Sequence, residues 1–171
     1  MTRSVVVGII GATLVVATTA VFPADKTKSE QAFDRLASLK GEWKGDAFGG
    51  PTKLIYTLTA NGSALMERCR PQKGNEMITM FTVDGDHLIA THYCSAKNQP
   101  QMATAAIADP QKPLAFLLVR VTGLKSQGDF HNTGLTMVQE DNDHLTQEWS
   151  YQSKGKTGKN VFHFARVGGP A

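Results

Sequence analysis

The stretch KLIYTLTANGSALMERC, residues 53–69, decides the fold. Two runs rich in β-branched, aromatic and aliphatic residues flank ANGS at 60–63, a cluster of turn-forming residues. This pattern is typical of a β-hairpin. We expect Thr59 to pair with Ala64 across the turn, and that register determines which side chains share a face of the sheet.

Similar runs, separated by clusters of Gly, Pro, Asn and Asp, continue on both sides of this hairpin. The expected strands are 41–48, 52–59, 63–69, 76–83, 87–95, 101–108, 114–122, 132–140, 144–152 and 160–167. Short connections favour antiparallel neighbours, and closing the sheet would remove its exposed edges. The sequence therefore predicts an all-β fold, an antiparallel meander barrel of about ten strands like those of lipocalins and fatty-acid-binding proteins.

One amphipathic helix is expected before the first strand, in SEQAFDRLASLKG at 29–41. Ser29 is the expected N-cap, an apolar stripe follows at helical spacing, and Gly41 ends the helix. The stripe consists of Phe33, Leu36 and Leu39.

Two further pairings, Cys69 with Glu76 and Val83 with His87, extend the register over four strands. One face then collects mainly apolar residues and is assigned to the interior, and the other collects Lys, Arg and four Thr residues. The expected interior set is Leu54, Tyr56, Leu58, Leu65, Glu67, Cys69, Glu76, Ile78, Met80, Leu88, Ala90, His92 and Cys94.

In this register Tyr56, Glu67, Ile78 and His92 form one row across adjacent strands. Opposed residues have Cβ atoms about 4.5–5.5 Å apart, so Tyr56 and Glu67 are within hydrogen-bonding reach. A carboxylate inside a barrel is costly without partners, which indicates a pocket with a few convergent polar groups. The predicted ligand-binding residues are Tyr56, Glu67, Met80, His92, Cys94, Trp43 and Trp149, the two tryptophans plugging or lining one end.

The cysteines are expected to remain thiols. Cys69 and Cys94 flank Glu76 from two separate strands, which puts their Cα atoms about 9–10 Å apart, beyond disulfide reach. A nucleophilic pair of His92 and Cys94 is disfavoured because residues i and i+2 of a strand stand about 6.5–7 Å apart. Neither a zinc-ligand spacing nor a GxSxG motif occurs, so the sequence favours binding over catalysis, with no metal or cofactor.

The N-terminus has the layout of a secretory signal peptide. A single cationic residue, Arg3, precedes the uncharged run 5–17, and the small residues of ATTA follow. We expect cleavage after Ala20 and a periplasmic or secreted protein with no membrane attachment; an uncleaved anchor is the alternative. The expected division is a signal peptide (1–20), a linker and helix start (21–32), a barrel domain (33–167) and a tail (168–171).

A formal charge of +3 without basic runs argues against nucleic-acid binding. The sequence sets no oligomeric state.

Four segments of the chain are similar to a bacterial family of lipocalin-like (calycin-type) proteins that has no established reaction. They read FDRLASLKGEWKG, YTLTANGSALMER, EMITMFTVDGDHLIATHYCSAKNQPQM and LTMVQEDNDHLTQEWSYQSKGK. The resemblance implies an antiparallel β-barrel over about 33–167, with Cys94 belonging to the motif and Cys69 departing from it. The residues that carry over are Trp43, Glu67, His92, Tyr93, Cys94, Asn98, Gln99 and Met102; Asn98 and Gln99 are expected to satisfy backbone groups at the strand end.

GEWKGDAFGGPT (41–52) is also similar to the GxWxGxG opening of nitrobindin-type haem barrels, in which a histidine near the C-terminus ligates iron. His163 is the corresponding candidate here, although Phe48 departs from that pattern. Alternation either exposes His163 or, after a one-residue change in the preceding loop, sets it beside Trp149.

The main hypothesis is an exported, non-catalytic barrel that binds a small, mostly apolar molecule through Tyr56, Glu67 and His92. A haem-binding barrel using His163 is one alternative. A barrel filled by its own side chains, acting through its surface, is the other.

Overall fold

The computed structural model describes residues 25–168. The predicted signal peptide and the last residues of the tail therefore lie outside the described residues. A single α-helix, α1 (Lys28–Ala37), begins the described part. Its N-cap is Thr27 rather than Ser29, because Thr27 and Glu30 form a reciprocal capping box that satisfies two free backbone N–H groups.

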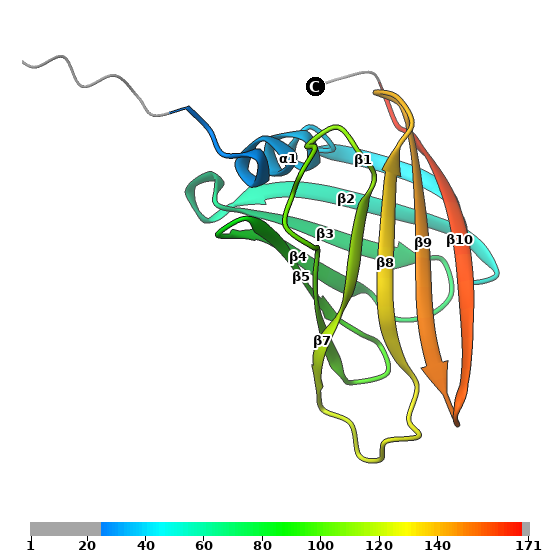
Figure 1. The fold of residues 1–171 in the computed structure, drawn as a ribbon. Helices are drawn as coiled ribbons and strands as arrows, with labels where there is room; N and C mark the ends of the chain where they lie inside the picture. Colours follow the sequence, from blue (N-terminus) through cyan, green and yellow to red (C-terminus); the bar gives the residue numbers. More distant parts are fainter. Residues whose placement is uncertain (1–24, 169–171) are drawn as a thin grey trace, which may run out of the picture.

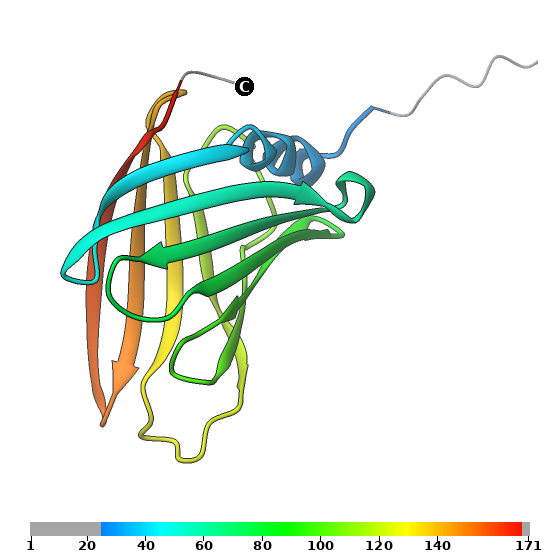
Figure 2. The same cartoon turned by 180° about the vertical axis from the view of Figure 1, so that it is seen from behind.

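Ten antiparallel strands follow and close into one barrel, with β1 hydrogen-bonded to β10 (Figures 1 and 2). A 3₁₀ turn, η1 (Ala60–Gly62), separates β2 from β3. The strands are β1 (Gly41–Ala47), β2 (Gly50–Thr59), β3 (Ala64–Pro71), β4 (Met77–Asp84), β5 (His87–Tyr93), β6 (Gln99–Ala103), β7 (Leu114–Thr122), β8 (His131–Gln139), β9 (His144–Ser153) and β10 (Lys156–Arg166). The predicted fold class, an antiparallel barrel preceded by one short helix, is confirmed.

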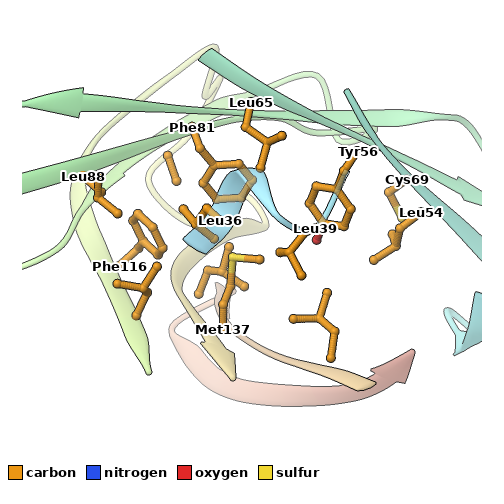
Figure 3. Close-up of a cluster of buried hydrophobic side chains, with 14 of the residues drawn as sticks. Leu36, Leu39, Leu54, Tyr56, Leu65, Cys69, Phe81, Leu88, Phe116 and Met137 are labelled. Atoms are coloured by element: carbon orange, nitrogen blue, oxygen red, sulfur yellow. The ribbon is translucent and has the colours of Figure 1, made fainter. Parts of the chain in front are cut away.

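The helix closes one end of the barrel, where β1 begins (Figure 1). Leu36 and Leu39 point in among apolar side chains from several strands, as Figure 3 shows. Trp43 is fully buried at this end, where its Nε1 donates to the carbonyl oxygen of Leu39 at 2.8 Å. The guanidinium of Arg166 lies 4.2 Å from the centroid of the Trp43 ring, a cation–π contact.

The β2–β3 hairpin has the expected register. Thr59 pairs with Ala64, and Tyr56 pairs with Glu67. The next two predicted pairings are each wrong by one residue: Cys69 pairs with Met77, and Val83 pairs with Leu88.

The first error turns the wrong face of β4 inward in the predicted register. The second error cancels the first, so the predicted faces of β5 are correct. Met77, Thr79 and Phe81 face the interior, whereas Ile78 and Met80 lie on the outer face and are half-buried. The prediction that Met80 lines the pocket is therefore wrong. On β5, Leu88, Ala90 and His92 are buried as expected.

The length of the β4–β5 turn explains how β4 pairs with β5, and the charge of Glu76 explains which face of the chain points outward just before β4. Asp84 pairs with His87, which leaves a two-residue turn whose first residue, Gly85, has φ +59°. Such turns match the twist of the flanking strands, and glycine adopts positive φ without a steric cost. At the other end of β4, Arg68 and Arg70 hold the carboxylate of Glu76 on the outer face.

Two pairs of neighbouring strands, β1–β10 and β7–β8, form seams of the barrel that differ in how tightly the strands are joined. At the β1–β10 seam, a Cβ on Gly45 would lie 2.1 Å from the carbonyl oxygen of His163, so only glycine fits there. At the β7–β8 seam, pairing extends only from Leu114–Met137 to Leu117–Gly134.

Within residues 25–168, no helix has the length and apolar character needed to cross a membrane.

Candidate functional site

A cavity of about 150 Å³ lies inside the barrel, toward the end opposite α1. Four lining residues are exposed and mark its rim: Phe48, Ser95, Phe130 and Asn160. The deeper wall is apolar, with Cys69, Met77, Cys94, Trp149, Phe162 and Phe164. Its polar members are Glu67, His92, Asn132 and Gln147. An apolar chamber with a few polar groups has the character of a small-molecule pocket.

Two polar members of the cavity, Glu67 and His92, belong to a row of polar side chains that crosses four neighbouring strands. Tyr56 on β2 is opposite Glu67 on β3, Glu67 is opposite Thr79 on β4, and Thr79 is opposite His92 on β5. All four side chains are buried. We call Tyr56, Glu67, Thr79 and His92 the polar row. Sequence reasoning had Ile78 in the place of Thr79.

Hydrogen bonds connect the polar row to the opposite wall. Tyr56 Oη is 2.5 Å from Glu67 Oε2. From β9, Gln147 Nε2 reaches Glu67 Oε2 at 2.6 Å and Tyr56 Oη at 2.8 Å. Trp149 Nε1 is 3.0 Å from Gln147 Oε1. These contacts span the interior, because β3 and β9 are not neighbours in the barrel.

The indole of Trp149 fixes the direction of every bond in this group. An indole N–H only donates, so the atom it meets on Gln147 is the amide oxygen, and the amide NH₂ faces Tyr56 and Glu67. The Tyr56 hydroxyl accepts a hydrogen bond from that NH₂ group and donates its own proton to a hydrogen bond with Glu67. Glu67 Oε2 therefore accepts two hydrogen bonds and carries no proton.

The pKa values of this group reflect burial. Burial raises the pKa of the Glu67 carboxyl, while hydrogen bonds from Tyr56, Gln147 and Thr79 act in the opposite direction. Burial, followed by the nearby Glu67 charge, raises the pKa of Tyr56 well above its ordinary value, so its hydroxyl keeps its proton.

His92 is held on one nitrogen and free on the other. Its Nδ1 lies 2.9 Å from Thr79 Oγ1, and its ring lies against Trp149 with centroids 4.8 Å apart. Burial lowers the pKa of His92 to about 4, which makes the imidazole neutral at physiological pH. Nε2 is buried and has no hydrogen-bond partner among the described residues. A buried polar atom without a partner is uncommon and calls for an explanation.

Both cysteines are free thiols, as predicted, although the register used for that prediction was shifted. Cys69 is buried, and burial raises the pKa of its thiol. Cys94 is half-buried at the cavity wall. Its Sγ accepts a weak hydrogen bond from the backbone N–H of Ala96, and no hydrogen bond joins it to His92 in residues 25–168.

The structure divides the predicted site residues into three groups. Glu67, His92, Cys94 and Trp149 line the cavity, and Tyr56 lies behind Glu67 as its hydrogen-bond donor. Trp43 is at the closed end, away from the cavity lining. Met80, as noted, faces outward.

Sequence reasoning missed two residues that organise the site, Thr79 and Gln147. Gln147 was accessible, because it lies two residues before Trp149 on one strand and so shares its inward face. Thr79 was hidden by the register error on β4.

Asn98 satisfies a backbone group, as expected, whereas the contact of the Gln99 side chain is with another side chain. Asn98 Nδ2 donates to the carbonyl oxygen of Phe130 at 2.6 Å, tying two loops at the mouth of the barrel. Gln99 Oε1 instead accepts from the Thr122 hydroxyl at 2.9 Å.

His163 lies on the outside of the barrel. Phe162 and Phe164 line the cavity, while the exposed ring of His163 has its Nδ1 2.7 Å from Thr146 Oγ1. This is the first of the two arrangements that the sequence left open. In the described part of the chain, no three His, Cys, Asp or Glu side chains gather closely enough to hold a metal ion.

Fold and site together define a class: a closed antiparallel β-barrel with one helix-capped end and a small, polar-anchored cavity at the other. The chain matches no model of a known protein family, and no curated protein is a detectable relative.

Proposed function

We propose that this chain is an exported, lipocalin-like barrel that binds a small, mostly apolar molecule in the cavity and does not catalyse a reaction on it. The observation that carries the proposal is the cavity itself, about 150 Å³ in size, walled mainly by aromatic and sulfur-containing side chains. A cavity of about this volume is large enough for a molecule such as benzene.

The arrangement of the polar groups supports binding rather than chemistry. The carboxyl of Glu67 is engaged by Tyr56 and Gln147, and Nδ1 of His92 is engaged by Thr79. The thiol of Cys94 has no base bonded to it in the described part of the chain. Polar groups fixed in this way orient a bound molecule, whereas a nucleophile needs an activating base within hydrogen-bond reach.

Binding can be tested with a variant that fills the cavity. Cys94→Phe adds an aromatic ring at the cavity wall, and Thr57→Phe adds the same ring at an exposed position on the outer face of β2. We expect toluene to shift the backbone amide NMR signals of cavity residues in the wild type and in Thr57→Phe, with no shifts in Cys94→Phe. Equal shifts in all three proteins would contradict the proposal.

The natural occupant can be sought by native mass spectrometry of protein purified from the periplasm. A co-purified small molecule that is lost in Cys94→Phe would support the proposal. A protein that carries nothing and ignores toluene would favour a barrel that acts through its surface. The same spectrum tests export, since cleavage after Ala20 would remove residues 1–20 from the mature chain.

The haem alternative receives little support from the position of His163 outside the cavity lining. Adding hemin tests it directly: a Soret band that disappears in His163→Ala would restore it.

A further inference from the structure

The bare Nε2 of His92 indicates what kind of molecule the cavity accepts. His92 is 3% exposed, lines the cavity, and has no partner for Nε2 among the described residues. A buried nitrogen in this position costs free energy until something satisfies it. Whether the missing partner is a donor or an acceptor depends on which ring nitrogen carries the proton of the neutral imidazole.

The hydrogen-bond network assigns that proton. Trp149 orients Gln147, Gln147 and Tyr56 both donate to Glu67 Oε2, and the remaining capacity of the carboxylate is at Oε1. Thr79 stands directly opposite Glu67. As a hydrogen-bond donor to that carboxyl group, the Thr79 hydroxyl lowers its pKa and so favours its ionised form. A hydroxyl has one proton, so the bond between Thr79 and His92 takes its proton from Nδ1. Nε2 is left as an acceptor.

We infer that the bound molecule carries a hydroxyl or N–H group that donates a hydrogen bond to Nε2 of His92, while a ring-sized apolar body packs against Trp149. The inference rests on the proposed function and narrows its ligand to small aromatic or alicyclic alcohols, phenols and amines. The cavity volume of about 150 Å³ suits a single ring, and the exposed rim at Phe48 and Phe130 leaves room for a substituent that points outward.

Phenol and toluene are suitable probes because they have nearly the same shape and differ in one hydroxyl. Their dissociation constants should be measured by NMR titration on the wild type, His92→Phe and His163→Phe. The last is a matched control, the same substitution at an exposed histidine outside the cavity lining. A net hydrogen bond of about 1 kcal/mol corresponds to roughly a fivefold change in affinity.

We expect the preference for phenol over toluene to fall about fivefold in His92→Phe and to remain unchanged in His163→Phe. If both probes bind the wild type but the preference is the same in all three proteins, the hydrogen-bond inference fails while the proposed function stands. If neither probe binds the wild type at millimolar concentration, the proposed function fails.

Glu67→Gln gives a second, opposite readout. Tyr56 and Gln147 require the new amide oxygen at the Oε2 position, which turns its NH₂ toward Thr79. Thr79 then donates to Nδ1 of His92, and Nε2 carries the proton. We expect this variant to lose its preference for phenol and to favour benzaldehyde, which only accepts. An unchanged preference in a folded variant, checked by circular dichroism, would overturn the relay.

The tautomer can also be read without any ligand. Long-range ¹H–¹⁵N NMR spectra of the unliganded wild type distinguish the two neutral forms of an imidazole. We expect the Nδ1–H form for His92; the Nε2–H form would overturn the inference even if both probes bind.

Discussion

Gln147 on β9 donates from Nε2 to Oε2 of Glu67 on β3 at 2.6 Å, across the interior of the barrel. Because these strands are not neighbours, the bond ties opposite walls together, and the hydrogen-bond partners of the buried carboxyl group among residues 25–168 are uncharged.

Replacing Gln147 by leucine should destabilise the protein. The change removes one donor from Glu67 and the acceptor of the Trp149 N–H, and leaves both groups buried. We expect the free energy of unfolding in urea to fall by about 3 kcal/mol, since each unsatisfied buried group costs about 1–3 kcal/mol. Gln152→Leu, at a half-buried position on the same strand, should stay within about 0.5 kcal/mol of the wild type. Equal losses in the two variants would show that the network contributes nothing specific.

The buried imidazole of His92 should make stability depend on pH. Its folded pKa of about 4 lies below the ordinary 6.5, so its contribution to stability is complete above pH 6.5 and is lost as the pH falls toward 4. The loss is on the order of 3 kcal/mol at its limit. The raised pKa of Glu67 acts in the opposite direction, giving stability at low pH that is lost as the pH rises through its folded value.

Comparing variants separates the two groups. In urea unfolding at pH 7 and pH 4.5, the wild type should lose more stability than His92→Phe does, and His163→Phe should retain the wild-type loss. If His92→Phe lost as much unfolding free energy between pH 7 and pH 4.5 as the wild type does, the imidazole would be exposed to solvent in the folded protein.

The two thiols should differ in reactivity. Cys94 is half-buried at the cavity wall, whereas Cys69 is buried and its pKa is raised. A thiolate is the reactive species, so we expect iodoacetamide to label Cys94 in the native protein and Cys69 only after unfolding. Mass spectrometry of Cys94→Ser provides the control: native label on that variant would place Cys69 within reach of solvent.

Gly45 should be the most sensitive glycine on β1. A methyl group there would meet the backbone carbonyl of His163 at the β1–β10 seam. We expect Gly45→Ala to lower the free energy of unfolding by about 3 kcal/mol, because the two strands must move apart. Gly50→Ala is the matched control, since its added methyl group would have its nearest neighbour 3.8 Å away. Thermal unfolding that shifts equally in both variants would argue against a close seam.

The fold followed from local patterns, which explains where prediction succeeded. Alternation in residues 53–69 fixed the β2–β3 register, and turn clusters marked every strand, although β6 is shorter and β10 longer than expected. The error on β4 arose at the β3–β4 connection, where Cys69 pairs with Met77 rather than with Glu76. The second error lay in taking DGD at 84–86 as a three-residue connection, whereas Asp84 pairs with His87 and leaves two residues in the turn.

The site was harder to predict than the fold because hairpin register relates only neighbouring strands. It identified Tyr56 opposite Glu67 and placed His92 in the same row. It had no means of bringing Gln147 against Glu67, because that contact depends on how the closed sheet curves across its own interior. His92 was still predicted correctly on the inner face, because the register error between β4 and β5 cancelled the one between β3 and β4.

The hydrogen bond between Gln147 and Tyr56 joins residues 91 positions apart in the sequence. It exists only when the two ends of the meander have come around to complete the ring. A fragment lacking either β2 or β9 cannot form this hydrogen bond, so it cannot hold the polar row against Gln147. The selectivity that we propose for the cavity therefore requires the complete barrel.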